Sequence, residues 1–170
     1  MIARHTLGLS GAAFRTSWFT ITSLLRAVGH ALEKVDAIRG DAVFRQVVAD
    51  HWRRLTTSRP EPIIFWKFIE QQRNAALKEY ELQVARELRT YSAPSENGFR
   101  LVLSVDLASV RPGGATQTDT AQIVSVIKDG PFKNRNDREV AALAVAFWHT
   151  YLDGIDQDYE ARRQAEAPAG

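Results

Sequence analysis

The sequence predicts an α+β fold that is mainly α: a four-helix bundle with one β-hairpin inserted between helices 3 and 4. Apolar residues recur every three or four positions in four long segments, as in amphipathic helices. Between the third and fourth segments the pattern changes to alternation, which is typical of half-buried strands. Proline and glycine residues separate these segments. Together these observations favour helices packed around a small antiparallel sheet.

The first helix is predicted over residues 14–38, where apolar side chains are spaced alternately by four and three positions. This is the stripe of a helix that packs in an antiparallel bundle. Its members are Phe14, Trp18, Ile21, Leu25, Val28, Leu32 and Val35. Gly29 interrupts the helix where a missing side chain would let another helix approach closely. Gly40 ends the helix, and Asp41 is the predicted N-cap of a second helix over residues 42–56.

A third helix is predicted over residues 63–91, because Pro60 and Pro62 stand where prolines commonly open a helix. After a loop, alternating apolar residues predict strands at 99–107 and 117–127, which we expect to pair as a hairpin over about 99–127.

The fourth helix is predicted over residues 137–152, with Asn136 and Glu139 as its capping box and one further turn as an extension. The expected domain therefore covers residues 1–160, and residues 161–170 are expected to form a disordered C-terminal tail.

The amino-acid composition excludes several classes of function for this protein. The chain has no cysteine, which excludes disulfide scaffolds, thiol nucleophiles and zinc–cysteine sites. A chain without cysteines fits a reducing compartment, and we expect a cytoplasmic location. Its apolar stretches fall short of the roughly 20 residues that span a bilayer, so no membrane partner is predicted. The net charge is +2, and the basic surplus of the first 60 residues allows contact with phosphates.

The most informative polar stretch is residues 70–81 (EQQRNAALKEYE), where charged and amide side chains recur at spacings of three to five. One interpretation is a solvated helix face with ion pairs, such as Glu70 with Arg73 and Lys78 with Glu81.

A second interpretation comes from the segment RNAALKEY at residues 73–80, which resembles the signature of the helical HEPN superfamily. In that signature an arginine, commonly followed by asparagine, precedes a histidine by four to six residues, and a tyrosine often follows the histidine by two. Arg73, Asn74 and Tyr80 match this spacing, and Lys78 stands in the place of the histidine. Many members are metal-independent ribonucleases in which the arginine and histidine meet across a dimer interface.

Lys78 changes what the resemblance implies, since a lysine holds a phosphate but shuttles protons poorly near neutral pH. The prediction is a non-catalytic HEPN-like binding or interaction module for a nucleotide, RNA or partner protein. Arg73 and Lys78 would contact the anion, and Asn74 and Tyr80 would position them. The alternative is a metal-independent HEPN-type endoribonuclease in which Arg73 works with a histidine outside the motif. Whether the protein is an enzyme stays open.

Secondary site candidates are Glu70, His51 and His30. His30 with Glu33, and His149 with Asp153, have spacings that would place two metal ligands on one helix face. Basic neighbours of His30 oppose a cation, so no metal and no cofactor is predicted. Aromatic residues cluster on single helices beyond what a small core hides, which favours a homodimer. The expected partners are therefore a second copy, RNA or a nucleotide, and a partner protein.

Overall fold

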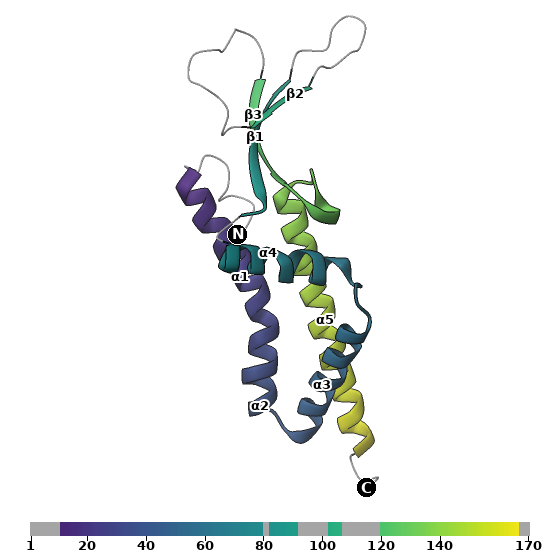
Figure 1. Cartoon of the computed structure of the whole chain (residues 1–170). Helices are drawn as coiled ribbons and strands as arrows, with labels where there is room; N and C mark the ends of the chain where they lie inside the picture. The colour runs from purple at the N-terminus through teal and green to yellow at the C-terminus, as the bar shows by residue number, and fades with distance from the viewer. Residues whose placement is uncertain (1–10, 80–81, 92–101, 107–119, 167–170) are drawn as a thin grey trace, which may run out of the picture.

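The computed structural model describes residues 11–79, 82–91, 102–106 and 120–166 (Figure 1). It confirms the fold class: four helical segments pack together, and antiparallel strands are inserted between the third and fourth. In Figure 1 the sheet stands at one end of the helices. In the part of the chain that is described, no helix is long and apolar enough to cross a membrane.

The helical segments follow the predicted order. The first consists of α1 (Gly11–Ala31), the π-helical turn η2 (Leu32–Asp36) and α2 (Ala37–Arg39). The second is α3 (Ala42–Thr57). The third consists of η3 (Ile64–Ile69), α4 (Glu70–Asn74) and η4 (Ala75–Glu79), and Figure 1 shows it crossing between α1 and α5. A short turn, η6 (Gly130–Phe132), precedes the fourth, α5 (Asp137–Glu166).

The third helix is shorter than predicted, because it ends at Glu79 and residues 84–91 form strand β1 (Val84–Tyr91). The prediction that this helix reaches residue 91 is wrong. Strands β2 (Val102–Asp106) and β3 (Thr120–Ile127) pair antiparallel with the two edges of β1, in the order β2-β1-β3. The strands predicted at 99–107 and 117–127 therefore lie on either side of a third strand, and not next to each other.

Helix α5 is longer than predicted and takes in residues 161–166 of the expected tail. The second half of α5 packs against α3, and this packing stabilises the helix beyond the predicted end. Ile155 is buried with Val47 and Val48, and the Tyr159 ring meets Phe44 edge-on at 5.3 Å. Packing of one face stabilises a helix far more than its intrinsic propensity does.

The main core confirms the stripe predicted on the first helix. Phe14, Trp18 and Leu25 are buried, whereas Val35 at the far end of the stripe is exposed. Trp148 of α5 crosses α1 at Gly29, where an added Cβ atom would lie 2.8 Å from the indole ring. The same indole donates a hydrogen bond to the carbonyl of Leu25 at 2.7 Å. Gly29 thus permits the close approach that the sequence predicts.

Both predicted helix starts are also present. The Asp41 carboxylate accepts from the Phe44 amide at 2.8 Å, as an N-cap does. At the start of α5, Asn136 Oδ1 accepts from the Arg138 amide at 2.9 Å.

Candidate functional site

A groove of about 360 Å³ lies between the first and third helical segments. α1 contributes Ser23, Arg26, Ala27 and His30, while Arg73 and Leu77 come from the facing helix. The lining residues that the structure describes therefore include two guanidinium groups and one imidazole, and none of these described residues carries a carboxylate. Arginines on a low-dielectric wall create a field that attracts anions.

Helical spacing explains how these side chains come together. Arg26 and His30 are four residues apart, and Ser23 precedes Arg26 by three, so all three share one face of α1. Arg73 and Leu77 are likewise four apart on the third helix. The contact of Trp148 with Gly29 and Leu25 fixes α1 in place. The groove is thus built on two packed helices, which hold side chains more firmly than loops do.

Arg73 is half-buried, and its Nη1 donates to Asn74 Oδ1 at 3.1 Å. Because an amide carries no charge, this bond orients the guanidinium without neutralising it. The expected ion pair of Arg73 with Glu70 is not formed, and Glu70 Oε2 instead lies 3.7 Å from Arg59 Nη2. The structure therefore leaves the Arg73 charge to face the groove.

A second hollow, of about 270 Å³, is lined by other residues of the third helical segment and by Gln83. Its walls carry amide, indole and charged side chains: Trp66, Lys67, Glu70, Gln71, Asn74 and Gln83. The Arg59 guanidinium lies 3.5 Å from the centroid of the Trp66 ring, at the edge of this hollow. Two of the predicted site residues, Glu70 and Asn74, therefore lie here and not in the groove of Arg73.

His51 does not join Arg73. Its Nε2 lies 2.8 Å from Asp158 Oδ2, and Arg54 donates to the same oxygen at 2.7 Å. The hydrogen bond from Arg54, and to a smaller extent the one with His51, hold the pKa of Asp158 below its ordinary value. His51 also meets the Tyr151 ring edge-on at 5.7 Å. It fastens α3 to α5 and does not line the groove of Arg73, so within one chain the two side chains are not brought together.

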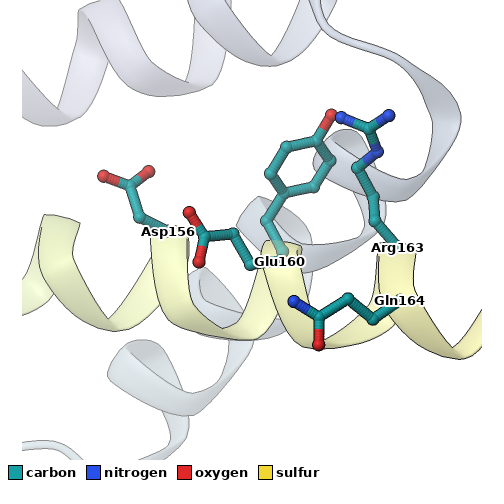
Figure 2. A pocket seen from close by; sticks show the side chains of 5 residues that line it. Asp156, Glu160, Arg163 and Gln164 are labelled. Carbon is teal, nitrogen blue, oxygen red and sulfur yellow. The ribbon is translucent and has the colours of Figure 1, made fainter.

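A third hollow, of about 550 Å³, runs along the C-terminal part of α5. Figure 2 shows Asp156, Glu160, Arg163 and Gln164 projecting from this helix. Beside them, the Tyr159 hydroxyl donates to Asp41 Oδ2 at 2.8 Å. Hydrogen bonds from Phe44 and Tyr159 hold the Asp41 pKa below its ordinary value. The hollow carries mixed charge, and its central tyrosine serves to hold the start of α3 against α5.

The remaining candidates are only partly described. Lys78 lies in η4, but its side chain lies outside the described residues, as does the whole of Tyr80. Within the described ranges, no three His, Asp or Glu side chains form a group that would hold a metal ion. The convergence of His30, His149 and a carboxylate that a metal enzyme would need is therefore not present there.

Sequence reasoning missed two arginines. Arg26 is one of the basic neighbours of His30 that oppose a bound cation, yet it lines the groove together with His30. Its spacing of four from His30 could have marked a basic helix face. Arg59 was not singled out, and nothing local to it signals its stack on Trp66.

No protein-family model matches the chain, and neither the curated proteins nor the solved structures contain a match to it.

Proposed function

We propose that the protein is a binding module that holds a phosphate group of a nucleotide or of RNA in the groove of Arg26, His30 and Arg73. The observation that carries this proposal is that three basic side chains from two helices line one groove, and that the described lining residues include no carboxylate. Membership of the HEPN superfamily stays a prediction from residues 73–80.

The chemistry of the groove supports a phosphate more than a carboxylic substrate or a metal. Guanidinium groups make paired hydrogen bonds to phosphate oxygens, and Arg26 and Arg73 approach from opposite walls. Ser23 adds a hydroxyl donor, and Ala27 and Leu77 add short apolar surfaces to the walls of the groove.

Replacing Arg73 with alanine is expected to weaken binding of a short single-stranded RNA by about 10-fold to 100-fold, because one hydrogen-bonded charge contact is lost. Fluorescence anisotropy with labelled RNA at two salt concentrations measures this change, and the salt slope should fall as well. Arg45→Ala is the matched control. Arg45 is exposed on α3 and does not line the groove, so this substitution removes an equal charge at a different place. Equal losses in both variants would contradict a site at Arg73.

A second candidate function is the metal-independent endoribonuclease, and the observation that favours it is that His30 lines the same groove as Arg73. An imidazole moves protons near neutral pH while a guanidinium stabilises charge on the phosphate. The same protein preparation, incubated with RNA with and without EDTA, separates the two functions. EDTA-insensitive cleavage that disappears in both His30→Ala and Arg73→Ala would establish the enzyme. Intact RNA that is nevertheless bound would establish the binding module.

We also propose that two copies associate through the outer face of the first helical segment. Leu24 is 62% exposed and Ile38 is 65% exposed, and both belong to the first helical segment. Large apolar side chains exposed on one element suit a twofold contact with a second copy. Light scattering after gel filtration should show a dimer that Ile38→Glu converts to a monomer. Leu143→Glu, at an exposed apolar position on α5, is the control and should stay dimeric. A monomeric parent protein would rule out this contact.

A further inference from the structure

We infer that the ligand is a nucleotide unit whose phosphate lies in the groove. Its base bears carbonyl oxygens and lies in the second hollow, which is lined by the amides of Gln71, Asn74 and Gln83 and is called the amide-lined hollow below. This inference rests on the proposed function, because it assigns the second half of the same ligand. Four features support it: adjacent residues that line the two hollows, the hydrogen-bonding groups of the second hollow, the different charge of the two hollows, and an arginine stacked beside the second.

Two consecutive residues of the third helical segment line the two hollows, one residue for each. Arg73 lines the groove, Asn74 lines the amide-lined hollow, and the hydrogen bond of 3.1 Å between their side chains joins the two walls. A ligand that lies over this pair of side chains therefore contacts both hollows, with its phosphate on the Arg73 side and its base on the Asn74 side.

Two side-chain amides in the amide-lined hollow already accept a hydrogen bond through their oxygen atoms. Asn74 Oδ1 accepts from Arg73, and Gln83 Oε1 accepts from Gln72 Nε2 at 3.1 Å. Each amide therefore keeps its NH₂ group for a ligand. Glu70 and Gln71, which line the same hollow, add acceptor oxygens. Donors beside acceptors match uracil, which offers two carbonyl oxygens on either side of a ring N–H.

The charge of the two spaces differs as the two ends of a nucleotide do. Among the described lining residues the groove has two arginines and no carboxylate, whereas the amide-lined hollow has one lysine and one glutamate, Lys67 and Glu70, whose charges balance. The balanced charges there do not attract a second phosphate as the groove does, and leave an uncharged ring as the better occupant.

Arg59 supplies a stacking surface for that ring. Its Cζ lies 3.5 Å from the centroid of the Trp66 ring and its Nη2 lies 3.7 Å from a Glu70 oxygen, so both partners hold the guanidinium over the indole. The Arg59 side chain is nevertheless 59% exposed, which leaves its outer face open. Unstacked RNA bases commonly stack on arginine planes as well as on aromatic rings.

Competition binding with short oligouridylate, short oligoadenylate, uridine monophosphate and inorganic phosphate tests the inference. Oligouridylate should bind the parent protein about 10-fold more tightly than oligoadenylate. Arg59→Ala should weaken oligouridylate by about 10-fold, as loss of one stacking contact does. Arg59→Lys is the matched control for charge: it should be as weak as Arg59→Ala, because lysine has no plane to stack. Inorganic phosphate should compete equally well in all three proteins.

The outcomes separate this inference from the proposed function. If uridine monophosphate competes as well as oligouridylate, the ligand is a free nucleotide, and if only the oligomer competes, it is RNA; both support the assignment of the base. Equal binding of both oligomers, unchanged by Arg59→Ala but lost in Arg73→Ala, would overturn the base site and leave the phosphate site standing. Failure of the parent protein to bind any of these probes would overturn both. The comparison of the two oligomers needs no variant, so a folding defect cannot obscure it.

Discussion

Replacing Phe65 with alanine is expected to lower the free energy of unfolding by about 3–5 kcal/mol, the usual cost of removing a buried phenylalanine ring. Phe65 is 0% exposed and lies at the centre of the aromatic core. Its ring centroid is 4.7 Å from that of Trp66, 5.6 Å from Phe147 and 5.8 Å from Trp148. These neighbours come from two different helical segments, so alanine would leave a cavity that neither segment can close alone.

Chemical denaturation followed by tryptophan fluorescence measures this loss. Phe19→Ala is the control, since Phe19 lies on α1 and is 38% exposed, and its loss should stay below about 1 kcal/mol. A similarly small loss for Phe65→Ala would show that the third helical segment does not depend on this contact. Binding to the groove should weaken with Phe65→Ala only where the protein begins to unfold, because Phe65 does not line it.

The first helix, its glycine and the cap of α3 could be predicted from the sequence, because interactions between residues close together in the chain determine them. The stripe from Phe14 to Leu32 faces the core because a single period of 3.6 residues runs through it. Gly29 could be singled out because a glycine inside such a stripe is costly unless a neighbour needs the space, and Trp148 does. Asp41 caps α3 through an interaction that spans only three residues.

Strand β1 could not be predicted in this way. Val84, Leu88 and Tyr91 recur at helical spacing, and the residues between them include good helix formers such as Ala85 and Glu87. The strand forms because β2 and β3 pair with both of its edges, with Leu88 opposite Val105 and Ile123. Those partners lie far along the chain, and long-range pairing overrides a local preference.

For the candidate site, too, single residues could be selected from the sequence but their arrangement in space could not. Arg73, Asn74 and His30 could each be selected from the sequence by residue type and spacing. Their grouping could not, because it depends on how the first and third helical segments pack. His30 joins Arg73 across that contact, whereas His51, an equal candidate by sequence, is taken up by Asp158 on α5.

The stability of the protein is expected to fall as pH rises from about 4 to about 6, through one carboxyl group at the junction of the sheet and α5. Asp137 is the first residue of α5 and is 1% exposed. Oδ1 accepts from the Arg138 amide at 2.9 Å, but Oδ2 has no hydrogen-bond partner. Burial raises the pKa of Asp137 to about 6 and outweighs this amide and the nearby Arg138 charge, which both favour the ionised form.

The direction of the effect follows from which state holds the proton. Between the ordinary pKa of 3.8 and the raised value of about 6, the folded protein keeps a proton that the unfolded chain has lost. Raising the pH through this interval removes that proton from the folded state, and the free energy of unfolding falls by up to about 3 kcal/mol. Asp137→Asn cannot ionise, so its stability should lack this component of the pH dependence.

Denaturant unfolding at several pH values between about 4 and 7 measures the difference between the parent protein and Asp137→Asn. Asp129→Asn is the control, because Asp129 is exposed in the turn that precedes α5 and should leave the pH profile unchanged. Parallel profiles for all three proteins would mean that Asp137 ionises as readily in the folded state as in the unfolded chain. A slope confined to the proteins that retain Asp137 would locate the effect where Asn136 bridges to Val126 of β3 and α5 begins. Ionisation of one side chain would then weaken the joint that attaches the sheet to the helices.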